Sequence, residues 1–175
     1  MLESIKNAVH TFAVWLVGLC GLGEAFANYV YVLFISMLPI IELRGAIPVA
    51  FALGMDPVIS FLVAIVGNLL PIPFIMLLIK PVCNFLKKTR LFSWFPRFIE
   101  SKVEKNKGKV EKYAKWGLYI FVAVPLPGTG AWTGALIASF LDFKFKDSMV
   151  AIILGVLTAG LIMSIFSYGL LGLIF

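Results

Sequence analysis

One acidic and one basic residue sit close together inside a long apolar run. Glu42 and Arg44 are the charged residues of the stretch 26–53. Placing a charged side chain in the middle of a bilayer costs about 2.5–3.5 kcal/mol on insertion scales, so such a residue is a candidate functional residue by default. This pair constrains the fold of the chain more than any other feature of the sequence.

The spacing of the pair predicts a broken helix. Residues i and i+2 point to different sides of a regular helix, whereas they share a face in extended backbone. An interior proline also removes a helical hydrogen bond and clashes with the preceding turn. We therefore expect a break from Pro39 to Gly45, after which a helix restarts near Gly45 with Pro48 in its first turn. The alternative is one proline-kinked spanning helix in which Glu42 and Arg44 neutralise each other.

The composition predicts an integral membrane protein. The 175 residues are 61% hydrophobic and 14% charged, with a mean hydropathy of +1.02, and a chain of this length has no room for a second domain. Eleven of the fifteen Lys and Arg lie in residues 80–115 against three Glu, a net charge of +8. The positive-inside rule places that segment in the cytoplasm, and the flanking apolar stretches argue against nucleic acid as its partner.

In chain order, we expect four parts of one membrane domain, residues 1–175. Residues 1–23 are expected to form an interfacial or partly inserted helix, with a short span as the alternative. Residues 24–80 form repeat one and residues 116–175 form repeat two. Between them, residues 81–115 follow an apolar stripe with lysines on the other face, which predicts a basic amphipathic cytoplasmic helix.

The first predicted span is a 23-residue apolar stretch from Pro57 to Ile79. Pro71 and Pro73 predict a kink within it. Asn68 is expected to hydrogen-bond a neighbouring helix, the alternative being that it lines a cavity.

A shift of 88 residues aligns the two halves of the chain. Pro39 then falls on Pro127 and Glu42 on Gly130, and in each half a broken apolar stretch precedes a polar turn and a long span. The charges place the two hairpins on opposite sides of the membrane. The predicted fold is therefore an all-α integral membrane protein. It is an inverted repeat of two re-entrant helical hairpins, each followed by a transmembrane helix, with amphipathic interfacial helices in addition.

The two breaks form the candidate substrate site. Each second half-helix would turn its N-terminal N–H groups and positive dipole end toward the centre, which suits an anion. Arg44 adds donors suited to phosphate or carboxylate, and Glu42 is a candidate carrier of a coupled proton, with sodium as the other coupling ion. The competing interpretation is a structural loop whose glycines only permit tight turns. The expected substrate-binding residues are Pro39, Glu42, Arg44, Gly45, Pro48, Pro125, Pro127, Gly128, Thr129, Gly130, Trp132 and Thr133.

Two motifs give the chain a resemblance to the small multi-drug export protein family. They are Glu42-Leu43-Arg44-Gly45-Ala46-Ile47-Pro48 and Pro125-Leu126-Pro127-Gly128-Thr129-Gly130-Ala131-Trp132-Thr133-Gly134-Ala135. That family in turn resembles, more remotely, the DedA superfamily of membrane proteins with two opposed re-entrant hairpins, which are implicated in moving lipid phosphates such as undecaprenyl phosphate. The resemblance implies the same architecture and an acidic role for Glu42. The DedA families place essential arginines in the second half, where this chain has no charge between Lys115 and Asp142, so that role is not transferred.

The sequence predicts a transporter in the cell membrane and not an enzyme, because it shows no nucleophile with a base, no acidic cluster, no metal-ligand set and no cofactor motif. The first hypothesis is a carrier or flippase for an anionic amphiphile, a lipid phosphate such as undecaprenyl phosphate. The alternatives are a drug or cation exporter that binds its cation at Glu42, and a non-transporting membrane organiser whose basic helix recruits anionic lipid. Two spans and two hairpins would cover the polar breaks thinly, so we expect a homo-oligomer, a homodimer.

Overall fold

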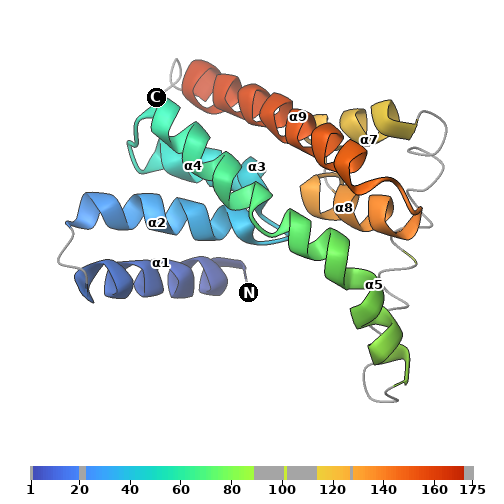
Figure 1. Ribbon diagram of the computed structural model, residues 1–175. Helices are drawn as coiled ribbons and strands as arrows, with labels where there is room; N and C mark the ends of the chain where they lie inside the picture. Colours follow the sequence, from blue (N-terminus) through green and yellow to red (C-terminus); the bar gives the residue numbers. More distant parts are fainter. Residues whose placement is uncertain (1, 20–22, 89–100, 102–113, 127, 172–175) are drawn as a thin grey trace. The chain divides into compact units, whose positions relative to one another are not determined.

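The computed structural model describes residues 2–19, 23–88, 101, 114–126 and 128–171, and these residues form helices and connecting turns without a strand (Figure 1). The predicted all-helical fold is therefore confirmed. Two described stretches are long and apolar enough to cross a membrane, Pro57–Ile79 and Phe145–Gly169, each with a mean hydropathy of 2.5. The helices are α1 (Leu2–Leu19), α2 (Glu24–Met37), α3 (Glu42–Ala52), α4 (Pro57–Leu69), α5 (Ile72–Lys88), α7 (Ala114–Ala123), α8 (Ala131–Phe140), α9 (Phe145–Ser164) and the π-helix η1 (Ile165–Leu171).

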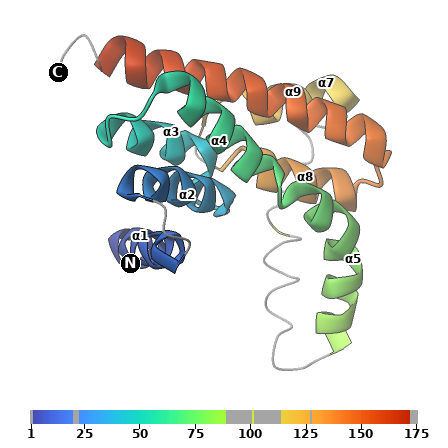
Figure 2. The same ribbon diagram turned by 60° about the vertical axis from the view of Figure 1, so that its left-hand side comes forward.

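The chain divides into two compact units, one of residues 1–70 with 160–175 and one of residues 71–159. In the first unit, α2 lies between α1 on one side and α3 and α4 on the other, and α3 also contacts η1 (Figure 2). Its fully buried side chains include Ile35, Leu43 and Ile47. In the second unit, α8 packs against α5 and α7, and the hydroxyl of Ser139 on α8 donates to the carbonyl of Met76 on α5 at 3.2 Å.

The chain breaks between α2 and α3, as the prolines predict. Leu38 leaves the helix with φ −74° and ψ 133°, because the ring of the following Pro39 excludes it from the α region. The two helices then pack against each other. This segment is therefore a helical hairpin, and the alternative of one kinked spanning helix is wrong.

The second helix of this hairpin begins three residues earlier than expected, at Glu42 instead of Gly45. The cause is a tight turn: the amide of Glu42 donates to the carbonyl of Leu38 at 2.9 Å, and that of Gly45 to Ile41 at 3.0 Å, so helical bonding is already established at the start of α3. The expected extended backbone across Glu42 and Arg44 is wrong, since both lie in the first turn of α3.

Pro48 lies in the interior of α3 and not in its first turn, which corrects the expectation from the sequence. Its ring nitrogen has no hydrogen to donate to the carbonyl of Arg44, four residues earlier. The α-helical bond that would ordinarily tie Arg44 to the next turn therefore cannot form. The charged pair is thus preceded by a helix break and followed by a missing α-helical hydrogen bond.

The second break separates α7 from α8, and α8 begins at Ala131. Gly128 and Gly130 take positive φ angles of 82° and 128° in this turn, a backbone region that glycine enters without a steric penalty. The hydroxyl of Thr129 donates to the carbonyls of Val124 at 2.9 Å and Leu126 at 2.8 Å, which closes the loop. The predicted site residue Pro127 lies outside the described residues.

Residues that lie 88 positions apart share backbone geometry. A positive φ occurs at Glu42 and Gly130, and again at Gly54 and Asp142. Four backbone hydrogen bonds of 2.9–3.3 Å also recur at this spacing. From donor amide to acceptor carbonyl, the pairs are Leu53–Val49 with Leu141–Ile137, Gly54–Phe51 with Asp142–Ser139, Met55–Ala50 with Phe143–Ala138, and Ser60–Asp56 with Ser148–Lys144.

Each of the two long apolar stretches carries a glycine where the first helix of the preceding hairpin approaches. A Cβ added at Gly67 would meet the side chain of Ser36 on α2. A Cβ added at Gly155 would lie 2.7 Å from the Cβ of Val122 and 3.1 Å from the carbonyl oxygen of Tyr119, both on α7. The glycines at this spacing of 88 residues therefore serve the same close packing.

The first apolar stretch is interrupted, as its prolines predict. α4 ends at Leu69 and α5 starts at Ile72, so the interruption falls on Leu70 and Pro71. α5 then continues through Pro81 to Lys88, so the expected boundary between residues 80 and 81 is not a helix end. Most of the predicted basic helix 81–115, namely residues 89–100 and 102–113, lies outside the described residues.

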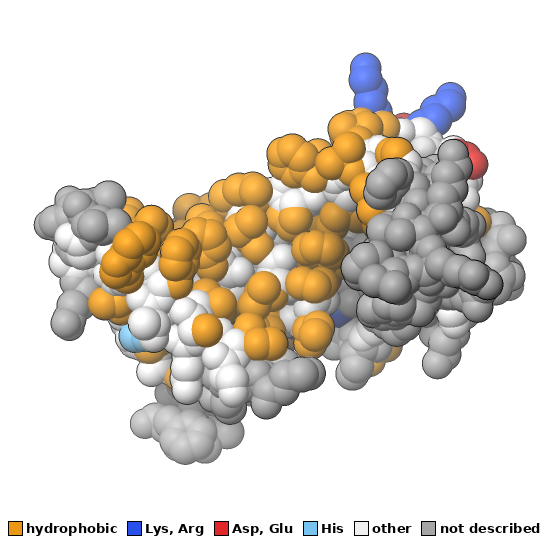
Figure 3. Space-filling model, turned by 90° about the horizontal axis from the view of Figure 1, so that it is seen from below, with side chains coloured by type: hydrophobic (Ala, Val, Ile, Leu, Met, Phe, Trp, Pro, Cys, Tyr) orange, Lys and Arg blue, Asp and Glu red, His pale blue; other side chains and the backbone are white. Residues whose placement is uncertain are grey.

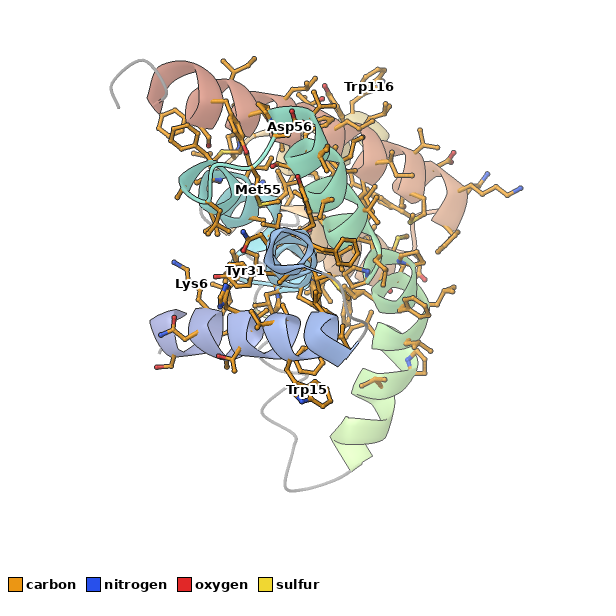
Figure 4. All side chains as sticks on the ribbon, turned by 90° about the vertical axis from the view of Figure 1, so that its left-hand side faces the viewer. Lys6, Trp15, Tyr31, Met55, Asp56 and Trp116 are labelled. Atoms are coloured by element: carbon orange, nitrogen blue, oxygen red, sulfur yellow. The ribbon has the colours of Figure 1, made fainter. Side chains whose placement is uncertain are left out.

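The N-terminal segment forms the 18-residue helix α1, which packs on α2 through aromatic pairs. The rings of His10 and Tyr31 meet edge to face at 5.1 Å, and those of Phe12 and Phe34 at 5.7 Å. Trp15 is 60% exposed and points away from α2 (Figure 4). Hydrophobic side chains are also widespread over the described part of the face in Figure 3. The interfacial position of this helix stays a prediction.

Gly67→Ala and Gly155→Ala should each lower the thermal unfolding temperature in detergent, because the added methyl groups overpack the helix contacts by about 1–3 kcal/mol. Gly18→Ala in α1 is the matched control: it has open space around it and should be neutral or stabilising. Equal effects of the three substitutions would contradict the close packing described above.

Candidate functional site

Glu42 is the buried charged residue of the first break. Its side chain is 4% exposed, and among the described residues it is the charged side chain that falls in the buried class. Its backbone has a φ of 51°, a left-handed conformation that costs a residue with a Cβ about 1–2 kcal/mol. Such strain persists only where the surroundings fix it, and it gathers at functional sites.

Arg44 is half-buried two residues further along the first turn of α3. It is close enough to Glu42 for the two charges to interact. A cation and a carboxylate therefore stand together in the first turn of α3, where the amides of Glu42 and Gly45 already donate to the carbonyls of Leu38 and Ile41. This arrangement can bind an anion through Arg44 while Glu42 competes for the same guanidinium.

The remaining predicted residues of the first break shape the turn. Pro39 is exposed, whereas Gly45 is half-buried. A Cβ at Gly45 would contact the side chain of Ile41. Glycine therefore lets Ile41, in the connection between α2 and α3, lie close to the start of α3. Pro48 is half-buried in α3, one helical turn beyond Arg44.

The second break presents fewer polar groups than the sequence suggests. Thr133 and Gly130 are buried at the start of α8, and Trp132 is half-buried beside them. The single hydroxyl hydrogen of Thr129 is already directed at two backbone carbonyls. This geometry favours the structural interpretation for Thr129 and leaves the N-terminus of α8 and Thr133 as the polar groups of the break.

The structure brings the predicted residues together in two sets. Pro39, Glu42, Arg44, Gly45 and Pro48 belong to the unit that contains residues 1–70. The second set, in the unit of residues 71–159, is Pro125, Gly128, Thr129, Gly130, Trp132 and Thr133. Each hairpin thus assembles its own set, and the meeting of the two breaks in one substrate site stays a prediction.

Asn68, near the end of α4, is a second buried polar residue in the unit that holds Glu42. It is 1% exposed, and neither its Nδ2 nor its Oδ1 has a hydrogen-bond partner among the described residues. The hydrogen bond to a neighbouring helix that we expected is therefore not observed. An unsatisfied buried amide costs about 1–3 kcal/mol, and Val156, 88 residues later, fills its position with a buried apolar side chain.

Sequence reasoning missed a long-range contact made by Tyr168 in η1. The Tyr168 hydroxyl lies 3.2 Å from the carbonyl oxygen of Met55 and 3.0 Å from Oγ of Ser60, and its ring meets Phe51 edge to face at 5.2 Å. These contacts hold the turn after α3 against a π-helical segment, a geometry that is often found at functional sites. No local pattern could reveal a pairing across 108 residues.

A buried carboxylate at a break between apolar helices and two stretches long enough to span a membrane are features typical of membrane transport proteins. A family model described as "Putative small multi-drug export protein" matches residues 42–162, which include both hairpin motifs. The chain belongs to this family of export proteins, which is a transport family and not an enzyme class. No curated protein and no solved structure matches the chain. The more remote resemblance to DedA proteins stays a prediction.

Glu42→Gly should have a free energy of unfolding about 1 kcal/mol larger than that of Glu42→Ala, and so unfold at a higher temperature. Glycine removes the left-handed backbone strain that alanine keeps. Both variants lack the carboxylate, so their difference isolates the backbone term. Thermal unfolding in detergent, followed by circular dichroism, measures it. Ala46→Gly is the control at a right-handed position of α3 and should be destabilising; a destabilised Glu42→Gly relative to Glu42→Ala would contradict the strain.

Asn68→Val should raise the thermal stability by about 1–3 kcal/mol, because it removes an amide without partners and copies the residue that repeat two has at this position. The reciprocal substitution Val156→Asn should lower stability by a similar amount. Loss of stability in Asn68→Val would show that the amide has a partner in the membrane-embedded protein and would contradict its orphaned state.

Proposed function

We propose that the protein carries an anionic amphiphile across the cell membrane, with a lipid phosphate such as undecaprenyl phosphate as the substrate class. The observation that carries the proposal is the pair at the start of α3: a buried, strained Glu42 with Arg44 in the same helical turn. A buried carboxylate is costly unless it is compensated. Its presence at a helix break in a chain of an export family is best explained by a role in binding or coupling.

The chemistry of the first break suits a phosphate head group. Arg44 offers a planar fork of donors that matches two phosphate oxygens. A phosphate that binds Arg44 displaces the carboxylate of Glu42, which then takes up a proton. Binding and proton uptake are coupled in this way, with sodium as the alternative coupling ion.

We propose further that the two hairpins are re-entrant and inverted. The recurrence of positive φ angles and hydrogen bonds at a spacing of 88 residues supports a structural repeat, and helices of ten to fourteen residues are about half as long as a membrane span. A cytoplasmic segment 80–115 would turn the hairpins to opposite sides. A homodimer would cover their breaks from lipid.

Export of an organic cation is the second candidate function, because the family is described by small multi-drug export. In that case Glu42 would itself bind the cation. Arg44 in the same turn opposes this, since its charge repels a cation that approaches the carboxylate. The lipid-phosphate carrier therefore remains the first proposal.

Reconstitution in liposomes tests the proposal by following the movement of a polyprenyl phosphate between leaflets. Arg44→Ala should slow the movement about tenfold to a hundredfold, the loss expected for one hydrogen bond to a charged group. Glu42→Gln should remove the pH dependence of the rate. Asp142→Asn and Lys144→Gln are matched controls on exposed residues and should keep the wild-type rate.

The same vesicles distinguish the two candidate functions. Loaded with a fluorescent organic cation, they should show no transport that depends on Glu42 if the first proposal holds. Cation efflux that survives in Arg44→Ala and disappears in Glu42→Gln, with no movement of the polyprenyl phosphate, would overturn it in favour of cation export.

A further inference from the structure

A cleft of about 380 Å³ opens between α7 and the first half of α9, within the unit of residues 71–159. Its volume lies in the range of small-molecule sites. None of its lining residues belongs to the substrate-binding residues predicted at the two breaks, although the family match covers the cleft entirely. The lining residues are Trp116 and Tyr119 from α7, and Asp147, Val150, Ala151, Leu154 and Thr158 from α9.

Two aromatic rings form the α7 wall of the cleft. The ring centroids of Trp116 and Tyr119 lie 6.2 Å apart at an interplanar angle of 87°, so they offer a face and an edge at right angles. Trp116 is 71% exposed and lies beside α9 (Figure 4). The face of a tryptophan ring attracts a cation electrostatically, because the π electrons give the face a negative potential.

Hydrogen bonds hold Tyr119 in place. Oγ1 of Thr158 donates to the carbonyl of Leu154 at 2.9 Å. Because its single hydrogen is used there, the hydroxyl of Tyr119 must be the donor in the 3.1 Å contact between Tyr119 and Thr158. Tyr119 is thereby tied across to α9, so this half of the aromatic wall is held in place before any ligand arrives.

Asp147 supplies the charge of the cleft. It stands in the first turn of α9, and the lining set contains this one carboxylate and no basic residue among the described residues. The neighbouring Lys144 and Lys146 are exposed and are not part of the lining. A carboxylate, two aromatic rings and an apolar floor together favour a bulky cation with a hydrocarbon surface over an anion or a small metal ion.

We propose that this cleft binds an organic ammonium group. The group can belong to a free lipophilic cation or to an ethanolamine or choline lipid head group, since both present the same charge and alkyl surface. Asp147 lies at the start of the apolar stretch Phe145–Gly169, where a spanning helix enters the head-group region and where Trp and Tyr gather in membrane proteins. The proposal is independent of the anion carried at Arg44.

Phenyltrimethylammonium is the probe, with tert-butylbenzene as its uncharged isostere. Calorimetric titration of the full chain in maltoside detergent should give saturable binding of the first and much weaker binding of the second. Asp147→Asn should weaken the binding about tenfold, and Trp116→Leu about two- to fivefold. Asp142→Asn, an exposed carboxylate in the turn before α9, is the matched control and should bind as the wild type does.

A structural role of Asp147 gives a different pattern. An acid in the first turn also stabilises a helix, so Asp147→Asn can lower the unfolding temperature without any ligand. Asp147→Glu keeps the charge and should keep the affinity, which separates the two roles. Equal affinity of the probe for Asp147→Asn and Asp147→Glu, no saturable binding to the wild type, or equal affinity for the uncharged isostere would each overturn the proposal.

Lipid nanodiscs distinguish the two sources of the ammonium group. If a lipid head group occupies the cleft, the apparent affinity for phenyltrimethylammonium should fall in phosphatidylcholine or phosphatidylethanolamine discs relative to phosphatidylglycerol discs. If the affinity for phenyltrimethylammonium is the same in all three kinds of disc, and Asp147→Asn still weakens it, the cleft binds free cations. Both results support an ammonium site, and loss of the Asp147 dependence in every disc would overturn it.

Discussion

The first hairpin depends on the burial of one carboxylate. Isolated in an apolar environment, the charge of Glu42 would cost many kcal/mol. The charge of Arg44 compensates it, and the two side chains stand in the same helical turn because α3 begins at Glu42. The tight turn after Pro39, the left-handed backbone and the unusual helix interior at Pro48 can be understood as the framework that keeps this pair together.

The sequence predicts the breaks well because proline acts locally. Pro39 excludes its predecessor from the helix, and the structure ends α2 within two residues of it. The exact start of α3 could not be predicted, since no propensity rule places a glutamate in the left-handed region; a glycine was the more probable choice. The early start then moved Pro48 into the interior of α3, where local rules disfavour it.

The rest of the candidate site depends on contacts between distant segments. Tyr168 reaches Ser60 across 108 residues, and the cleft beside Trp116 exists because α7 and α9 pack together at Gly155. A sequence pattern shows which residues are unusual for an apolar helix, but it does not show which of them contact each other in the folded chain. Asn68 shows the limit most directly, because its polar character was visible, whereas the absence of a partner among the described residues required the packed structure.

Comparison of the two halves of the chain explains why Glu42 matters. Positions 42 and 130 both take a positive φ where a helix begins, 51° at Glu42 and 128° at Gly130, and glycine adopts such angles more readily than any other residue. Repeat two fills this position with glycine, which adopts it without strain, while repeat one keeps a glutamate that costs about 1–2 kcal/mol there. The same contrast recurs between Asn68 and the apolar Val156. Stability alone favours the residues of repeat two at both positions, so the polar residues of repeat one are best explained by function.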